Sequence, residues 1–320
     1  MTLFLTVAFF AVFSILIGLF LWLLTVFFRV SRKGFRIVRG TLVSFLVSLP
    51  SFLFLILPLI VSYLVANAST RPQDRNLSET PASYGRDFDS VEFPSRDGLT
   101  LRGWLMEGHP GQPTVILTHG LLRNRQEVLD RGCALNKEDY PVLLFDFRNH
   151  GGSDRRYVSL GFEERLDILG AFDFLRGRRL EGRVVLMGVS MGAVAAIHAA
   201  ADLGGALEAI VADSPFSNLR ETAAHHTRLI LHLPAFPFED LFVWNLTRIG
   251  GFRADELDTV RALRRADPIP VLLIYGANDR RMPKATARAV FEAVPHPGKR
   301  IVFLRAPPMG RLTASTPICT

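Results

Sequence analysis

Two long uncharged segments dominate the first 70 residues of the 320-residue chain. Residues 2–28 are 27 consecutive uncharged positions and residues 41–66 are 26 more, and each exceeds the roughly 20 apolar residues that cross a bilayer. They predict two transmembrane helices and a membrane anchor over residues 1–68. The first segment is too long for the apolar part of a cleaved signal peptide and no basic residue precedes it. Pro50 and Pro58 kink or interrupt the second, which leaves a re-entrant hairpin as an alternative.

A different pattern begins after a polar linker at residues 69–86. Short apolar, β-rich runs alternate with stretches of helical periodicity, which predicts a mostly parallel eight-stranded sheet with helices on both faces. We expect this α/β domain at residues 87–305, with strands at residues 87–93, 99–106, 113–118, 142–145, 183–188, 209–213, 270–275 and 300–304. Its helices are expected near residues 125–135, 162–176, 191–201 and 284–294.

The sequence Gly188-Val189-Ser190-Met191-Gly192 lies where the fifth predicted strand meets a helix of small residues. This G-x-S-x-G pattern predicts a sharp strand-to-helix turn that exposes a nucleophilic serine at the carboxyl edge of the sheet. The two glycines leave room for so tight a turn. The helix that begins at Met191 would direct free N–H groups towards a developing oxyanion. The alternative is a glycine-rich turn that only packs a helix on a strand.

The positive charge of the chain is concentrated at one place. The formal net charge is +7, but residues 1–70 contain no acidic residue, and the rest of the chain is nearly neutral. The charge therefore does not indicate binding to nucleic acid. By the positive-inside rule, the basic connector between the uncharged segments is cytoplasmic, which predicts a two-pass membrane protein with an extracytoplasmic soluble domain. Arg71 and Arg75 oppose this topology weakly, and the connector itself contains Arg29, Arg32, Lys33, Arg36 and Arg39.

Six motifs follow one another between residues 87 and 304, and together they resemble an α/β-hydrolase of the membrane-anchored, serine-aminopeptidase-like or ABHD-type branch. The resemblance implies an α/β-hydrolase fold, here preceded by two transmembrane helices, and a serine hydrolase activity. The motifs are SRDGLTLRGW at residues 95–104, THG at 118–120, DFRNHGGS at 146–153, GVSMG at 188–192, DSPF at 213–216 and GANDRRMP at 276–283.

The resemblance also implies roles for single residues. Asp279 follows the seventh strand in the family pattern Gly-x-x-Asp-x-x-x-Pro and is the expected acid of a catalytic triad, with Asp213 as the alternative. The backbone N–H groups of Leu121 and Met191 are the expected oxyanion hole. His119 is expected to brace the loop after the third strand rather than to act as a base.

A base for Ser190 is missing from the place where the resemblance requires it. The family carries a histidine in the loop after the last strand, but no histidine follows Leu304 in this chain. His296 precedes that strand and would therefore lie at the wrong end of the sheet. The tail at residues 306–320 has three prolines, no acidic residue and no helical periodicity, from which we expect a truncation or a change of reading frame.

An insertion at residues 217–265 separates the sixth and seventh strands and is rich in aliphatic and aromatic residues. We expect a lid that shapes a pocket for a small acyl-bearing or peptide substrate, although a helical cap packed on its own core is an equal alternative. Three histidines of this lid could in principle reach Ser190: His225, His226 and His232. No metal-ligand spacing and no phosphate-binding loop is present, so neither a metal nor a cofactor is expected.

These patterns predict a membrane-bound serine hydrolase that acts on an ester, thioester or amide bond through a Ser190 acyl-enzyme and is impaired by the absent histidine. A catalytically silent, membrane-tethered binding or scaffold protein with the same fold is the alternative. The presence or absence of a base at Ser190 distinguishes the two.

Overall fold

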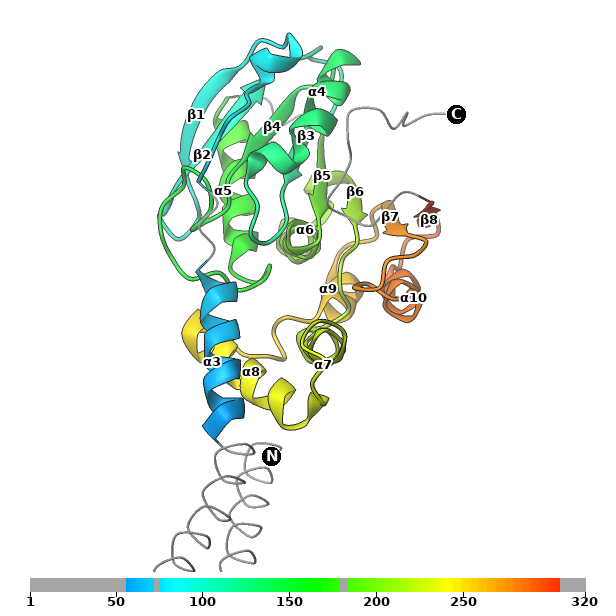
Figure 1. Cartoon of the computed structure of the whole chain (residues 1–320). Coiled ribbons are helices and arrows are strands. Elements are labelled where there is room, and N and C mark those ends of the chain that lie inside the picture. Colours follow the sequence, from blue (N-terminus) through cyan, green and yellow to red (C-terminus); the bar gives the residue numbers. More distant parts are fainter. Residues whose placement is uncertain (1–55, 72–74, 179–182, 306–320) are drawn as a thin grey trace, which may run out of the picture.

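The computed structural model describes residues 56–71, 75–178 and 183–305, and its main body is an eight-stranded sheet (Figure 1). The strand order is β1-β2-β4-β3-β5-β6-β7-β8; β2 runs antiparallel to its two neighbours and the other pairs are parallel. The expected mostly parallel sheet is therefore confirmed. The strands are β1 (Asp89–Pro94), β2 (Thr100–Met106), β3 (Thr114–Thr118), β4 (Val142–Phe145), β5 (Val184–Val189), β6 (Leu207–Asp213), β7 (Val271–Gly276) and β8 (Arg300–Leu304).

Helices cover both faces of this sheet, as the alternation of buried positions along β4 shows. Leu143 and Phe145 pack in the core beneath α5, α6, α9 and α10, whereas Val142 and Leu144 pack in a second cluster with residues of α4. The helices are α3 (Leu57–Thr70), η2 (Pro81–Tyr84), η3 (Arg125–Val128), α4 (Leu129–Lys137), α5 (Glu164–Gly177), α6 (Met191–Leu203), η4 (Gly204–Ala206), α7 (Leu219–Ile230), α8 (Ala235–Gly250), α9 (Thr259–Arg265) and α10 (Lys284–Ala293).

Within the described part of the chain, every helix is too short or too polar to cross a membrane. The first predicted transmembrane segment, at residues 2–28, lies outside the described residues, and so does most of the second, at residues 41–66. The described end of the second segment is α3, which has 14 residues. The described backbone is helical from Ile56 onwards and includes Pro58, so Pro58 does not interrupt the described part of this helix.

Helix α3 packs against α8 beyond one end of the sheet, beside α7 (Figure 1). The amide nitrogen of Asn245 donates a buried hydrogen bond of 3.0 Å to Ser62 Oγ on α3, and Ala66 is fully buried between the helices. The anchor boundary expected at residue 68 therefore falls inside a helix that is packed on α8 of the α/β domain. The reason is that α3 buries one side, which a lone membrane span would not do.

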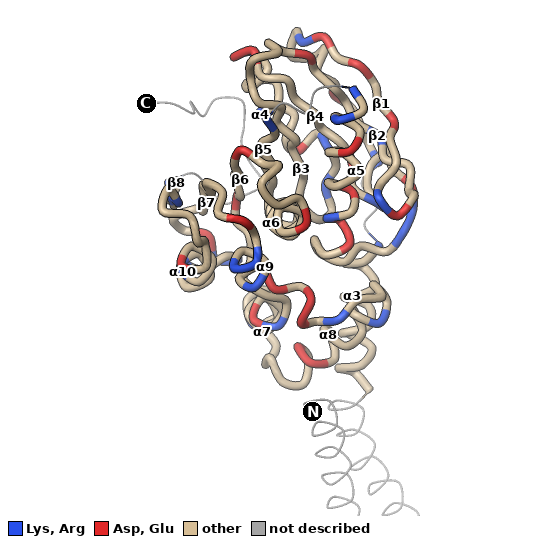
Figure 2. The backbone as a smooth tube through the Cα atoms, turned by 180° about the vertical axis from the view of Figure 1, so that it is seen from behind, with Lys and Arg blue, Asp and Glu red and all other residues tan. Residues whose placement is uncertain are grey.

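The insertion at residues 217–265 divides into two parts. Helices α7 and α8 pack on each other, and α8 also packs on α3, whereas α9 packs against α6 and α10 and so helps to cover the sheet. Residues 229–238 run from the last residues of α7 through the turn to the first residues of α8. They contain no charged residue and appear tan in Figure 2. The lid proper is thus the α7–α8 pair.

Strand β8 is an edge strand with apolar side chains that face outwards. Val302, Phe303 and Leu304 are 41, 40 and 48% exposed. This edge of the sheet therefore has an uncovered apolar surface in the described part of the chain, where only β7 pairs with β8.

A fully buried arginine connects the entry hairpin to the helices. Arg148, after β4, donates from Nη2 to Asp167 Oδ1 at 2.6 Å and to Asp97 Oδ1 at 2.9 Å. Asp167 lies on α5, and Asp97 lies in the turn between β1 and β2. The three side chains therefore hold three separate segments of the fold together.

Replacing Arg148 by Met should lower the free energy of unfolding by about 3–5 kcal/mol, because the buried carboxylate of Asp167 would lose its partner. Denaturant unfolding measures this loss. Arg96→Met is the matched control, since the Arg96–Asp173 pair is 2.8 Å long but 40 and 45% exposed, and such pairs contribute about 1 kcal/mol or less. Equal losses in the two variants would contradict the importance of the buried pair.

Candidate functional site

Ser190 lies at the turn between β5 and α6 in a strained backbone conformation. Its φ and ψ are 52° and −113°, a combination that non-glycine residues rarely adopt. The surroundings hold this conformation, because the Ser190 N–H donates to the carbonyl of Asp213 at 2.7 Å and its own carbonyl accepts from the N–H of Val194 at 3.1 Å. The turn therefore has the geometry of a nucleophile elbow.

The two glycines of the motif are required by the close approach of backbone segments. A Cβ atom on Gly188 would lie 2.4 Å from the carbonyl carbon of Gly192. A Cβ atom on Gly192 would lie 2.6 Å from the carbonyl oxygen of His119, in the loop after β3. The elbow is thus pressed between its own helix and the loop that was predicted to supply part of the oxyanion hole.

The predicted oxyanion donors are available at this loop. The carboxylate of Glu127 accepts the N–H of Gly120 at 2.6 Å, so the amide of Gly120 is not free to donate to a ligand. The next amide, of Leu121, and the amide of Met191 at the start of α6 have no acceptor among the residues that the structure describes. Both N–H groups remain free for a ligand oxygen, and the N-terminus of α6 favours negative charge there.

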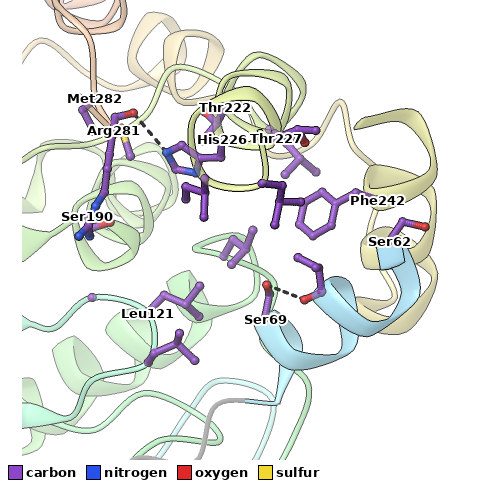
Figure 3. A pocket seen from close by; sticks show the side chains of 18 of the residues that line it. Ser62, Ser69, Leu121, Ser190, Thr222, His226, Thr227, Phe242, Arg281 and Met282 are labelled. Carbon is purple, nitrogen blue, oxygen red and sulfur yellow. Dashed lines mark hydrogen bonds between the residues drawn. The ribbon is translucent and has the colours of Figure 1, made fainter. Parts of the chain in front are cut away.

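Ser190 opens into a cavity of about 530 Å³ that lies between the sheet edge and helices α3, α7 and α8 (Figure 3). Ser190 is half-buried, and its Oγ forms no hydrogen bond with any described residue. Away from Ser190 the walls are largely apolar, with Val61 and Val65 from α3, Ile230 and Leu231 at the end of α7, and Phe242 from α8. The cavity therefore combines a polar end with an apolar end.

The carboxylate of Asp279, the predicted acid, accepts hydrogen bonds from the backbone of its own loop. Asp279 Oδ1 accepts the N–H of Arg281 at 2.7 Å and that of Met282 at 3.3 Å. Asp279 does not line the cavity, although Arg281 and Met282 both do. No described histidine hydrogen bonds to this carboxylate, so its visible role is to order the loop after β7.

Asp213, the alternative acid, is also fully engaged. Its carboxylate accepts from Arg131 Nη1 at 2.9 Å and from Ser214 Oγ at 2.9 Å. It is 7% exposed at the end of β6. Its carbonyl holds the Ser190 N–H, so Asp213 supports the elbow through its backbone.

All eight histidines of the chain fall in the described residues, and three are buried supports. His119 Nδ1 donates to the carbonyl of Gly120 at 2.8 Å, and its Nε2 accepts the N–H of Phe147 at 3.1 Å, which is the bracing contact expected from the sequence. Burial lowers the pKa of His119 to about 4, that of His150 to about 3 and that of His198 to about 4. All three are therefore neutral at pH 7.

His226 on α7 is the histidine that shares the cavity with Ser190. Its Nε2 donates to the carbonyl of Arg281 at 3.2 Å, which leaves Nδ1 without a proton, and burial lowers the pKa of its imidazole. The adjacent His225 donates to the carbonyl of Arg280 at 2.7 Å and does not line the cavity. No histidine in the described part of the chain hydrogen bonds to Ser190 Oγ.

The remaining histidines lie away from the site. His232 is exposed after α7. His109 is exposed and His296 half-buried, and each lies in a turn where its Nδ1 accepts a backbone N–H. His296 precedes β8, which runs parallel to β7, and it is therefore at the end of the sheet opposite to Ser190, as expected.

Sequence reasoning missed three contributors to the cavity. Arg281 belongs to the 276–283 motif but had no expected role, and Glu127 was treated only as part of a helix. Helix α3 was assigned to the membrane anchor, yet Val61, Ser62 and Val65 line the cavity. Charge and hydropathy give no signal for these contacts, because they depend on how distant segments meet.

Comparisons with known proteins agree with the α/β fold described above. The sequence model of the family described as serine aminopeptidase, S33 matches residues 109–256, which include Ser190 and end before Asp279. Among curated proteins, YqkD of Bacillus subtilis is 27% identical over 230 residues, covering 68% of this chain and 75% of its own length. Rv2307c of Mycobacterium tuberculosis is 28% identical over 222 residues, covering 68% of this chain and 70% of its own length.

Among solved structures, the esterase Pf2001 of Pyrococcus furiosus superposes with a TM-score of 0.61 at 26% identity, over 75% of this chain and 90% of the esterase. An α/β-hydrolase of a Penicillium species, GrgF, has a TM-score of 0.55 at 20% identity and shares the fold, over 69% of this chain and 91% of its own. The chain has the fold of the α/β-hydrolases. In sequence it is similar to the serine aminopeptidase-like proteins and to the Pf2001 esterase.

Replacing Gly188 by Ala should destabilise the protein by about 1–3 kcal/mol, because the new methyl group meets backbone atoms that cannot move aside. It should also displace Ser190 and abolish labelling of this serine by a fluorophosphonate. Gly177→Ala at the end of α5 is the control, since a methyl group there meets nothing within 4 Å. Thermal unfolding and labelling of both variants measure the effects; a Gly188→Ala protein as stable as the control would refute the steric argument.

The buried histidines predict how stability depends on pH. Their folded pKa values lie below the ordinary value of 6.5, so the unfolded chain takes up protons first and stability falls as the pH drops from about 6.5 to 4. His198→Leu removes one such group and should make the slope shallower by up to about 1.4 kcal/mol per pH unit. Denaturant unfolding at several pH values tests this, and an unchanged slope would contradict it.

Proposed function

We propose that this chain is a serine hydrolase that cleaves an ester, thioester or amide bond. In the proposed reaction Ser190 Oγ attacks the acyl carbonyl, its proton passes to the departing group, and water then releases the acyl group from Ser190. The observation that carries the proposal is the strained Ser190 beside two free backbone N–H groups at the polar end of the cavity. The likeness to the Pf2001 esterase supports an ester as one substrate class.

The shape of the cavity favours a substrate with an apolar acyl chain. The carbonyl end would lie at Ser190, Leu121 and the start of α6, and the chain would extend between α3, α7 and α8. Ile230, Leu231 and Phe236, around the α7–α8 turn, are 57, 37 and 47% exposed. This exposed apolar turn beside the cavity supports substrates that come from an apolar phase.

Membrane attachment is part of the same proposal. Helix α3 is the end of the uncharged segment 41–66, and its outer side exposes Ile60, Tyr63 and Leu64 at 46, 51 and 58%. A two-pass anchor with the hydrolase domain outside the cytoplasm would hold the α3–α7–α8 end of the domain close to the lipid. The positive connector between the two uncharged segments supports this orientation.

The lack of a histidine partner at Ser190 among the described residues favours a second candidate function. Ser190 Oγ has no histidine partner in the described structure, and Asp279 binds its own loop. These contacts favour a catalytically silent, membrane-tethered binding or scaffold protein with the hydrolase fold. His226 is the nearest substitute base that the cavity offers, and its free Nδ1 would have to reach Ser190 when a substrate is bound.

Labelling with a fluorophosphonate distinguishes the two functions. We expect slow labelling that is lost in Ser190→Ala, and ester hydrolysis far below that of a complete triad enzyme, because without a base only the ~10³–10⁴-fold acceleration by the oxyanion hole and binding remains. His226→Phe and the control His225→Phe, on adjacent positions of α7, test the substitute base. Loss of activity in His226→Phe alone would identify it as the base, and absence of labelling in the folded protein would contradict the hydrolase.

A further inference from the structure

A cationic side chain lies at the Ser190 end of the cavity. Arg281 lines the same cavity as Ser190, and Figure 3 shows its side chain extending from the loop after β7 towards Ser190. The guanidinium forms no hydrogen bond or ion pair with another described residue. A positive group with five N–H donors is therefore available to a ligand beside the candidate nucleophile.

The backbone of Arg281 is held from both sides. Its N–H donates to Asp279 Oδ1 at 2.7 Å, and its carbonyl accepts from His226 Nε2 at 3.2 Å. The following Met282 is buried and donates to the same carboxylate oxygen. The two side chains that a triad would use, an aspartate and a histidine, are thus employed here to fix the peptide that presents Arg281.

The other charges of the cavity leave this arginine uncompensated. Glu127 is the acidic residue among the lining residues, and its Oε2 accepts the N–H of Gly120 at 2.6 Å. Its Oε1 lies 3.7 Å from Nε of Arg123, the other lining cation. Glu127 and Arg123 therefore offset each other, and the positive charge of Arg281 is free to attract an anion.

We propose that Arg281 forms an anion subsite beside Ser190, and that the ligand of the cavity is an amphiphile with a carboxylate or phosphate group close to the bond at Ser190. The guanidinium would bind that group through two parallel N–H···O hydrogen bonds. The apolar part of the ligand would fill the space between α3, α7 and α8. Cleavage of such a ligand rests on the proposed hydrolase function, whereas its binding does not.

Calorimetric titration of the full chain with three probes tests the subsite: hexyl phosphate, hexanol and inorganic phosphate. We expect hexyl phosphate to bind at least about tenfold more tightly than either of the others, because only it uses both ends of the cavity. Arg281→Met should remove the preference over hexanol, and Arg281→Lys should keep part of it. Arg280→Met is the matched control, since Arg280 and Arg281 are both exposed residues of the same loop but only Arg281 lines the cavity.

Three results would overturn the proposal. Equal weakening by Arg280→Met and Arg281→Met would mean that only the general charge of the loop matters. Inorganic phosphate that binds as tightly as hexyl phosphate would mean a site for a free anion, and hexyl phosphate that fails to bind would mean no subsite. None of the three probes carries an acyl bond, so the titrations measure binding alone and a failure of catalysis leaves the binding result standing.

Discussion

The close contact between β5, the start of α6 and the loop after β3 is the constraint on which the site depends. Gly188, Gly192 and the backbone of His119 approach one another so closely that no side-chain carbon fits between them. This contact holds Ser190 at a positive φ, and the loop after β3 continues into Leu121, which lines the cavity together with Ser190. His119, neutral and buried, extends the support to β4 through the N–H of Phe147. The elbow is thus stabilised by the core of the sheet and does not depend on the lid.

The lid and the loop after β7 contribute a histidine and an aspartate, respectively, but these two residues are not arranged as in a catalytic triad. In a complete triad, an acid orients an imidazole and the imidazole takes the proton of the serine. Here Asp279 and His226 converge on the two polar backbone groups of Arg281, and the side chain that extends towards Ser190 in Figure 3 is a guanidinium. Arginine stays protonated at all ordinary pH values and cannot take a proton from serine. The groups around Ser190 therefore favour binding and orientation of an anion over proton transfer.

Local patterns in the sequence were sufficient to predict the sheet and the sharp turn at Ser190. The bounds of β4 and β8 were predicted as observed, since short apolar runs between turn residues have few alternatives in an α/β chain. The G-x-S-x-G spacing predicted the sharp turn at Ser190, because the close contact between Gly188 and Gly192 lies within five consecutive residues. The place of α9 on the sheet, the docking of α3 on α8 and the direction of Arg281 were not predictable in this way. Each depends on contacts between segments far apart in the chain, and the apolar composition of α3 matches a membrane span as well as a cavity wall.

Helix α3 belongs to two environments at once. One side of it forms a wall of the cavity through Val61, Ser62 and Val65, while its other side exposes Tyr63 and Leu64 and its N-terminus continues the uncharged segment. A sliding of α3 by a single residue along its axis, about 1.5 Å, would shift every wall residue relative to α7 and α8. Under the proposed membrane attachment, the thickness of the lipid layer would act on the position of α3 and so on the width of the cavity, which would make lipid thickness a mechanical control on ligand entry.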